Sequence, residues 1–346
     1  MPANFADRLN AAVAARGTPA VVGIDPVLER LPAALRPRDG TADAAAKALE
    51  AFSRTVIDRV APHVPAVKIN SAFFEAFYEF GVAAYYRLVA HAHSRGLLVI
   101  GDVKRGDIGS TAALYARGHL APPTASDINA DRIPDAVTLA GYLGRNAVAP
   151  FVAAGAPAGR GVYVLVRPSD PGADEVHEFA GASAVGGAER VGPASLPAAG
   201  RPPAPAPQPP SAGTEARPIH GASRFYEHMA ALVASWGAAA ELRGTGGWSC
   251  VGAVVAPKDV ASTAALRAAL PHTPFLVPGY GAQGAAADAC RACFRADGTG
   301  AVINASRSVI FAYEEERWRA QHGDDWAACI AAAAQQFARE AAALAR

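Results

Sequence analysis

Short apolar runs rich in valine and isoleucine recur along the chain, each bounded by glycine, proline or polar residues. Runs of this length and composition are typical of strands that are buried on both faces of a parallel sheet. Eight strands are predicted, at residues 20–24, 65–69, 97–102, 136–139, 161–166, 250–255, 274–277 and 300–304.

Longer alanine-rich segments with a helical pattern separate most of these runs, for example at residues 71–96 and 221–244. Regular alternation of strand and helix indicates parallel strands joined by right-handed crossovers, and eight repeats close a barrel. A doubly wound open sheet is the alternative, but the turn after the first strand reads GIDPVLERLP and lacks the glycine-rich dinucleotide motif. We therefore expect an α/β protein, a (β/α)8 TIM barrel forming a single domain over residues 1–346.

One segment interrupts this alternation, at residues 181–218, between the fifth strand and its helix. It is rich in proline, alanine and glycine and has little apolar content to bury, so a flexible surface insertion is predicted. The simplest interpretation is a tolerated loop. Its PPAPAPQPP stretch could also form a polyproline helix for an SH3-like partner.

Composition limits the classes of binding partner and the cellular compartments that are expected for this protein. The formal net charge is +1, which gives no excess that would favour nucleic acid or an anionic membrane surface, so a small-molecule substrate is expected. The N-terminal residues do not resemble a signal peptide and no apolar run is long enough to span a membrane, which predicts a cytoplasmic protein. Cys290 and Cys293 lack a second ligand pair at metal spacing, so neither a zinc site nor a disulfide framework is expected.

Charged and polar residues follow several of the predicted strands. In a closed barrel the active site lies at the carboxyl ends of the strands, so these side chains should converge on one rim. They are Asp25 after the first strand, Lys68 at the second, Asp102 and Lys104 at the third, Ser169 after the fifth, the PGYGAQG turn after the seventh and Arg307 after the eighth.

Lysine is scarce in this chain, and only Lys47, Lys68, Lys104 and Lys258 occur. Lys68 alone could equally be a buried salt-bridge partner. Asp102 and Lys104, two apart on a strand, should point to the same face. Asp107 lies in the following loop and could approach Lys104 or a neighbouring subunit. A lysine held between carboxylates stays protonated, which suits proton donation better than Schiff-base attack.

The rim also carries a candidate phosphate site. PGYGAQG is a glycine-rich turn before a helix, and Arg307 follows the next strand. The loops after strands seven and eight are the common phosphate site of such barrels.

Asp102, Lys104, Asp107, Ile108 and Thr111 together resemble the Asp-x-Lys-x-x-Asp-Ile-x-x-Thr signature of the orotidine 5′-phosphate decarboxylase family. The segments NFADRLNAAVAARGTPAVVGIDP, VKINSAFFEAFYEFG and PGYGAQG resemble its longer bacterial branch. The resemblance covers nearly the whole chain apart from the proline-rich insertion and the last helix.

The resemblance implies decarboxylation of orotidine 5′-monophosphate to UMP in pyrimidine biosynthesis, without cofactor or metal. Lys104 would protonate C6 of the pyrimidine, within a charge array shared with Asp102 and Lys68. The family also implies a homodimer in which Asp107 and Thr111 reach the partner subunit's site. The remaining expected contacts are Asp25 and Lys68 to ribose, Ser169 to the pyrimidine, and Gln283 and Arg307 to phosphate.

This chain departs from the family pattern in two loops. Ala140 and Gly141 stand after the fourth strand, where an Asn-Pro-Tyr turn is expected, and Asp170 follows Ser169 in place of asparagine. Asn304 and Ala305 flank the approach to Arg307. These differences concern loop geometry and pyrimidine contacts, because the signature charges are all present.

Three other functions are compatible with the same residues. A relative on the same barrel could decarboxylate or condense a sugar phosphate with magnesium. A Schiff-base aldolase could use Lys104 as a neutral amine. A catalytically silent barrel could simply bind a nucleotide.

Overall fold

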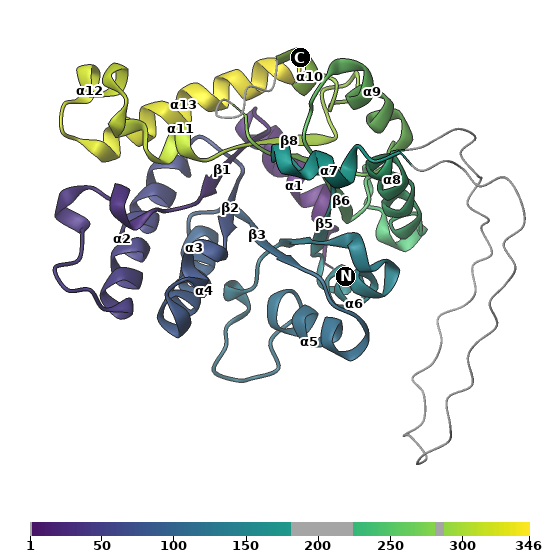
Figure 1. Ribbon diagram of the computed structural model, residues 1–346, viewed down its shortest axis with the longest axis horizontal. Helices are drawn as coiled ribbons and strands as arrows, with labels where there is room; N and C mark the ends of the chain where they lie inside the picture. The colour runs from purple at the N-terminus through teal and green to yellow at the C-terminus, as the bar shows by residue number, and fades with distance from the viewer. Residues whose placement is uncertain (1, 181–223, 281–286) are drawn as a thin grey trace, which may run out of the picture.

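The computed structural model describes residues 2–180, 224–280 and 287–346. Its eight parallel strands pair in sequence order, and the last pairs with the first to close a barrel (Figure 1). The predicted (β/α)8 fold is therefore confirmed. The strands are β1 Ala20–Ile24, β2 Ala66–Asn70, β3 Leu98–Arg105, β4 Ala136–Leu139, β5 Gly161–Arg167, β6 Val251–Val255, β7 Phe275–Val277 and β8 Ala301–Ala305.

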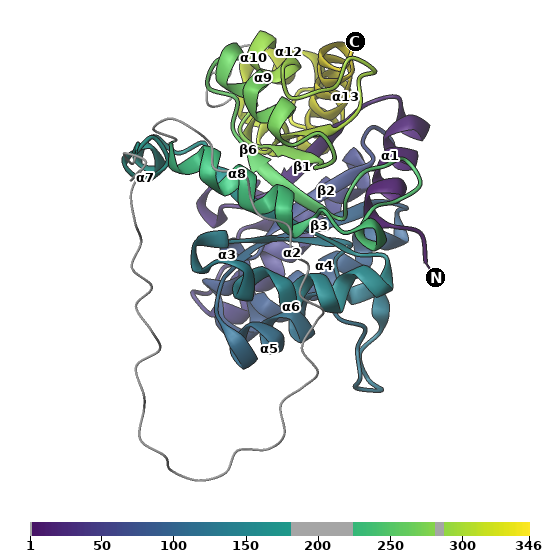
Figure 2. The ribbon, with the colours of Figure 1, turned by 90° about the vertical axis from the view of Figure 1, so that its right-hand side faces the viewer.

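Helices surround this barrel, and the view in Figure 2 shows the strands enclosed by them. Their bounds are α1 Phe5–Arg16, α2 Ala42–Val60, α3 Ala72–Glu75, α4 Tyr78–Ser94, α5 Gly109–His119, α6 Arg145–Gly155, α7 Asp174–His177, α8 Phe225–Trp236, α9 Val260–Ala269, α10 Ala287–Arg291, α11 Arg307–Ile310, α12 Glu316–His322 and α13 Trp326–Leu344.

All eight predicted strands are present within one residue of their expected starts. The apolar runs are buried because helices cover the outside of the barrel and side chains fill its interior; every residue of β1 and β6 is buried. Four strands extend past their predicted ends, β2 to Asn70, β3 to Arg105, β5 to Arg167 and β8 to Ala305. In β3 and β5 the pairing register shifts near the carboxyl end, which is a β-bulge at the rim.

The helical segment predicted at residues 71–96 is two helices, α3 and α4. The chain turns between them at Tyr78, whose φ of 56° lies in the left-handed region. Gly81 makes this turn compact, since a Cβ at that position would lie 1.8 Å from the carbonyl oxygen of Phe74. The close approach of the two helices therefore requires glycine at position 81.

The first and last helices complete the shell around the barrel. The Asn4 side chain caps α1 by accepting a hydrogen bond from Ala6 N, and Phe5 packs edge-to-face on Tyr163 of β5, with ring centroids 5.9 Å apart. The Asp325 side chain caps α13 in the same way. The helix α13 then packs against α2 and against β1.

The predicted insertion at residues 181–218 lies outside the described residues. Cys290 and Cys293 are buried thiols, and burial raises the pKa of Cys290 to about 11. Over the described residues, no three His, Cys, Asp or Glu side chains are grouped as metal ligands would be. No described helix is long and apolar enough to cross a membrane.

Candidate active site

A pocket of about 290 Å³ opens at the carboxyl ends of the strands. Three cationic and two carboxylate side chains line it, together with apolar residues from β5, β6 and β7. The polar lining residues come from most of the strands and are Asp25, Lys68, Asn70, Asp102, Lys104, Thr138, Ser169, Asn304, Ser306 and Arg307.

Asp102 of β3 lies at the centre of the charge array. Its Oδ2 accepts a hydrogen bond from Lys68 Nζ at 2.7 Å, and its Oδ1 accepts one from Lys104 Nζ, also at 2.7 Å. Burial alone would raise the pKa of Asp102, but the two ammonium groups outweigh it and hold the pKa well below its usual range. Asp102 is therefore a fixed anion that holds both lysines in the pocket.

The two lysines differ in exposure. The Lys68 side chain is 8% exposed and lies between two carboxylates, Asp102 and Asp25, whose Oδ1 is 3.8 Å away. Burial would lower its pKa, but these two carboxylates raise it above the ordinary value. The Lys104 side chain is 49% exposed and points into the open part of the pocket. Lys104 is thus the ammonium group with room to meet a ligand.

Asp107 and Thr111 do not line the pocket of their own chain. Asp107 lies in the loop after β3, where its carboxylate accepts a hydrogen bond from Ile108 N at 2.8 Å, and Thr111 is exposed on α5. In the described part of the chain, Asp102 is the one carboxylate in ion-pair contact with Lys104. Within this chain Lys68, between Asp25 and Asp102, is the lysine that lies between two carboxylates, and Asp107 does not approach Lys104.

Described residues of the predicted phosphate site also line the pocket. Arg307 begins α11 directly after β8, and Gly279 and Tyr280 of the PGYGAQG turn lie beside it in the lining. Gln283 lies outside the described residues. Ser169 lines the pocket from the loop after β5.

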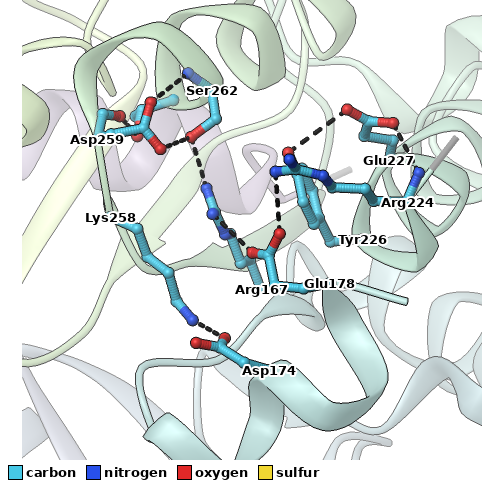
Figure 3. A network of polar contacts seen from close by, with 10 residues as sticks. Arg167, Asp174, Glu178, Arg224, Tyr226, Glu227, Lys258, Asp259 and Ser262 are labelled. Atoms are coloured by element: carbon cyan, nitrogen blue, oxygen red, sulfur yellow. Dashed lines mark hydrogen bonds and ion pairs between the residues drawn. The ribbon is translucent and has the colours of Figure 1, made fainter. Parts of the chain in front are cut away.

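A polar network surrounds the buried Arg167 at the end of β5, two residues before Ser169 (Figure 3). Arg167, the last residue of β5, donates to Ser262 Oγ at 2.7 Å and to Glu178 Oε1 at 2.8 Å, and its guanidinium lies 4.4 Å from the centre of the Tyr226 ring. Arg224 contacts the other carboxylate oxygen of Glu178. These contacts join the residues before and after segment 181–223 to the barrel.

Lys258 and Asp174 form a further ion pair in this network, between the loop after β6 and α7. Asp174 lies five residues beyond Ser169. The short segment 168–177 is therefore attached at both of its ends to other elements of the rim.

The departures from the family pattern lie beside the pocket rather than in it. Gly141 packs against β5 and α8, where a Cβ would lie 2.7 Å from Val164, and Ala140 N donates to the Arg105 carbonyl at 2.8 Å. Asp170 accepts a hydrogen bond from Gly172 N and caps a short 3-10 turn. Each departure has a local structural role, and none removes a charged residue from the pocket.

Four polar pocket residues are not among the predicted site residues: Asn70, Thr138, Asn304 and Ser306. Thr138 is fully buried in β4, and its hydroxyl contacts both Asp102 and the backbone of Lys104. The Asn304 carboxamide oxygen is buried without a hydrogen-bond partner among the described residues. The available signal was a single polar residue inside each of the apolar runs AVTL and GAVIN.

The chain is similar to known proteins over most of its length. A model of the "Orotidine 5′-phosphate decarboxylase / HUMPS family" matches residues 42–188. A relative from Rhodopirellula baltica named orotidine 5′-phosphate decarboxylase is 34% identical over 96% of this chain and 97% of its own. One of the same name from Haloarcula marismortui is 31% identical over 93% of this chain and 92% of its own. A crystal structure from Streptomyces avermitilis matches 99% of this chain and 96% of that chain with a TM-score of 0.68 and 30% identity.

Proposed function

The chain belongs to the orotidine 5′-phosphate decarboxylase / HUMPS family and decarboxylates orotidine 5′-monophosphate in pyrimidine biosynthesis, and we propose that Lys104 donates the proton that replaces carbon dioxide at C6. One observation carries this role. The Lys104 ammonium is hydrogen-bonded to the buried Asp102 carboxylate, yet its side chain is half exposed to the pocket.

The reaction breaks the bond between C6 and the carboxylate carbon. The electron pair stays on C6 and carbon dioxide leaves. This pair cannot delocalise into the ring, so an enzyme must stabilise the carbanion selectively over the bound substrate. Lys104 supplies a positive charge at that point and then transfers a proton from Nζ to C6, giving UMP and a neutral amine that regains its proton from solvent.

Electrostatic repulsion is a secondary contribution. Asp102 would lie near the substrate carboxylate, and two like charges 4 Å apart repel by about 4 kcal/mol at an effective dielectric near 20. Enzymes lower barriers by roughly 8–23 kcal/mol, so most of the effect has to come from another source. We assign it to Lys104, which Asp102 holds in place before the substrate arrives.

The other pocket residues bind the nucleotide. Asp25 Oδ1 is buried without a hydrogen-bond partner among the described residues, so it is a ready acceptor for a ribose hydroxyl beside Lys68. Ser169 contacts the pyrimidine. Arg307, with Gln283 of the preceding loop, binds the phosphate, because a guanidinium matches phosphate oxygens in a bidentate geometry.

The functional unit is a homodimer, with Asp107 and Thr111 completing the partner's site. Large apolar side chains are exposed near Asp107 and Thr111 in the chain and on the turn before α6: Ile108 by 57%, Leu114 on α5 by 66%, and Tyr142 after β4 by 79%. The helices α5 and α6 pack together beside them. Apolar groups exposed in one region are typical of a surface that another protein covers, and a second copy of this chain would cover it.

The whole chain, residues 1–346, acts as one barrel domain in the cytoplasm, with 181–218 as an insertion that catalysis does not use. The contact between the residues that flank segment 181–223 supports the proposal that the segment is an insertion. Ala180 and Arg224 form an antiparallel bridge, and Phe225 N donates to the Phe179 carbonyl at 2.9 Å. The barrel elements on either side are thus joined without the residues between.

An absorbance assay with orotidine 5′-monophosphate in EDTA, with UMP identified as product, tests this function. Turnover in EDTA is expected because no step uses a metal, whereas a magnesium-dependent sugar-phosphate enzyme would be inactive. UMP binding without any loss of substrate would indicate a silent barrel. Trapping of Lys104 by borohydride would indicate a Schiff-base aldolase.

A further inference from the structure

We propose that Thr138 is a positioning residue for the reaction, whose hydroxyl sets the geometry of Asp102 and Lys104 together. Thr138 lies in the middle of β4 and is 1% exposed. This inference rests on the proposed role of Lys104 as proton donor.

The pairing of β3 with β4 places Thr138 opposite the reactive residues. Gly101 pairs with Val137 and Arg105 pairs with Leu139, so three residues of β3 face the single residue Thr138 of β4. Bulges of this kind redirect side chains and leave backbone groups without a partner in the ladder. Asp102 and Lys104 are two of the three residues in this bulge.

The Thr138 hydroxyl supplies the missing partner. Its oxygen accepts a hydrogen bond from the Lys104 backbone N–H at 3.0 Å, and it donates its proton to Asp102 Oδ1 at 2.8 Å. The directions are fixed, because an amide N–H can only donate and an ionised carboxylate can only accept. One hydroxyl therefore joins the backbone of the lysine to the carboxylate that its own ammonium contacts.

The Lys104 backbone needs this support. Its φ is 44°, in the left-handed region that a residue with a long side chain rarely adopts. Residues in such conformations persist where the surroundings hold them, and they concentrate at active sites. Without the hydroxyl, the Lys104 N–H would lose its partner at the point where the chain is strained, and the lysine could relax away from Asp102.

The predicted consequence falls on turnover more than on binding. Thr138 fixes the atoms that stabilise and protonate C6, whereas the ribose and phosphate contacts come from other strands. Small displacements of a reacting group cost large factors in rate. Loss of the hydroxyl should therefore lower kcat and leave the affinity for UMP nearly unchanged.

The test compares Thr138→Val, which keeps the shape and removes the hydroxyl, with Thr138→Ser, which keeps the hydroxyl. We expect Thr138→Val to lower kcat by about tenfold or more with UMP affinity within about threefold of wild type. Thr138→Ser should stay within about threefold of wild-type kcat. Thr263→Val is the matched control, because Thr263 is also buried and its hydroxyl donates to a backbone carbonyl, in α9 outside the pocket.

Wild-type kcat in Thr138→Val, or equal losses in the serine and valine variants, would overturn the proposal. If Thr138→Val does not fold, Thr138→Ala and Thr138→Ser form a pair that differs only in the hydroxyl. Crystal structures of this pair provide a readout that does not depend on activity. A Lys104 backbone and Asp102 contact unchanged in Thr138→Ala would refute positioning, even if the wild-type protein failed to decarboxylate orotidine 5′-monophosphate and the proposed function were wrong.

Discussion

Lys68 donates a hydrogen bond from Nζ to Asp102 Oδ2 across 2.7 Å, and both side chains are at least 92% buried. The other oxygen of the same carboxylate accepts from Lys104. A buried charge is tolerated only when it is paired, so Lys68 and Asp102 depend on each other for their ionised states. The charge array is therefore a single unit, and the effects of substitutions at its three residues on activity and stability should not be additive.

Asp102→Asn should damage both activity and stability. The amide cannot pair with two ammonium groups, so Lys68 would be left with a single, more distant carboxylate, and loss of one partner of a buried pair costs about 3–5 kcal/mol. We expect kcat to fall by at least about one-hundredfold in a turnover assay. A urea titration of the same variant measures the loss in the free energy of unfolding. Asp297→Asn, at an exposed carboxylate that contacts Thr299, is the control. Near-normal kcat in Asp102→Asn would contradict the account of the array.

Arg307→Ala should weaken substrate binding through the phosphate. Charge-assisted hydrogen bonds contribute about 1.5–3 kcal/mol, so KM for orotidine 5′-monophosphate should rise by about tenfold to one-hundredfold. The variant and wild type should then differ little on orotidine, which has no phosphate. An equal loss on both substrates would mean that Arg307 acts elsewhere than at the phosphate.

Mixing two inactive variants tests whether Asp107 acts across the dimer. In a heterodimer of Lys104→Ala and Asp107→Ala, one site would carry both defects and the other would be intact. Random re-association of equal amounts should therefore restore about a quarter of wild-type activity. If Asp107 served its own chain, each site would keep one defect and no activity would return.

Stability should depend on pH through His93. Burial would lower its pKa, but the hydrogen bond and charge of Asp135 raise it above the ordinary value near 6.5. A raised pKa means that the pair stabilises the fold fully below about pH 6.5 and that this contribution is lost as pH rises through the folded-state value.

The free energy of unfolding should thus fall relative to that of His93→Gln between about pH 6 and pH 9, by about 1 kcal/mol. Urea titrations of both proteins at each pH measure this difference. Asp135 keeps its contacts to Arg8 and Val99 N, so the variant should fold. A difference that does not change with pH would show that His93 and Asp135 are not coupled.

The sequence predicts the strands of this fold well because each is a short apolar run bounded by glycine, proline or polar residues. Such a run is enough to indicate a strand that is buried on both faces. It also identifies Asp102 and Lys104, since charged residues at the carboxyl end of a buried barrel strand indicate a site at the rim. Their common direction was predicted from regular alternation along a strand. The structure achieves it through a bulge and a left-handed Lys104, which depend on the length of β4 beside β3.

Other features depend on contacts between distant segments and had no local signal. Arg167 follows an apolar run like many surface arginines, yet it is buried because Glu178 and Ser262 meet it from two other elements. From the sequence, Thr138 is expected only as one residue of a strand, although a polar side chain inside AVTL indicates a role at the site. The turn at Tyr78 likewise depends on the fit of Gly81 against Phe74.

The most direct test of the central claim is the turnover of Lys104→Ala beside its affinity for UMP. We expect kcat to fall by about four orders of magnitude or more while UMP still binds, because the ammonium acts mainly on the charge that forms at C6. A Lys104→Ala protein that binds UMP normally and turns over within about tenfold of wild type would contradict the claim.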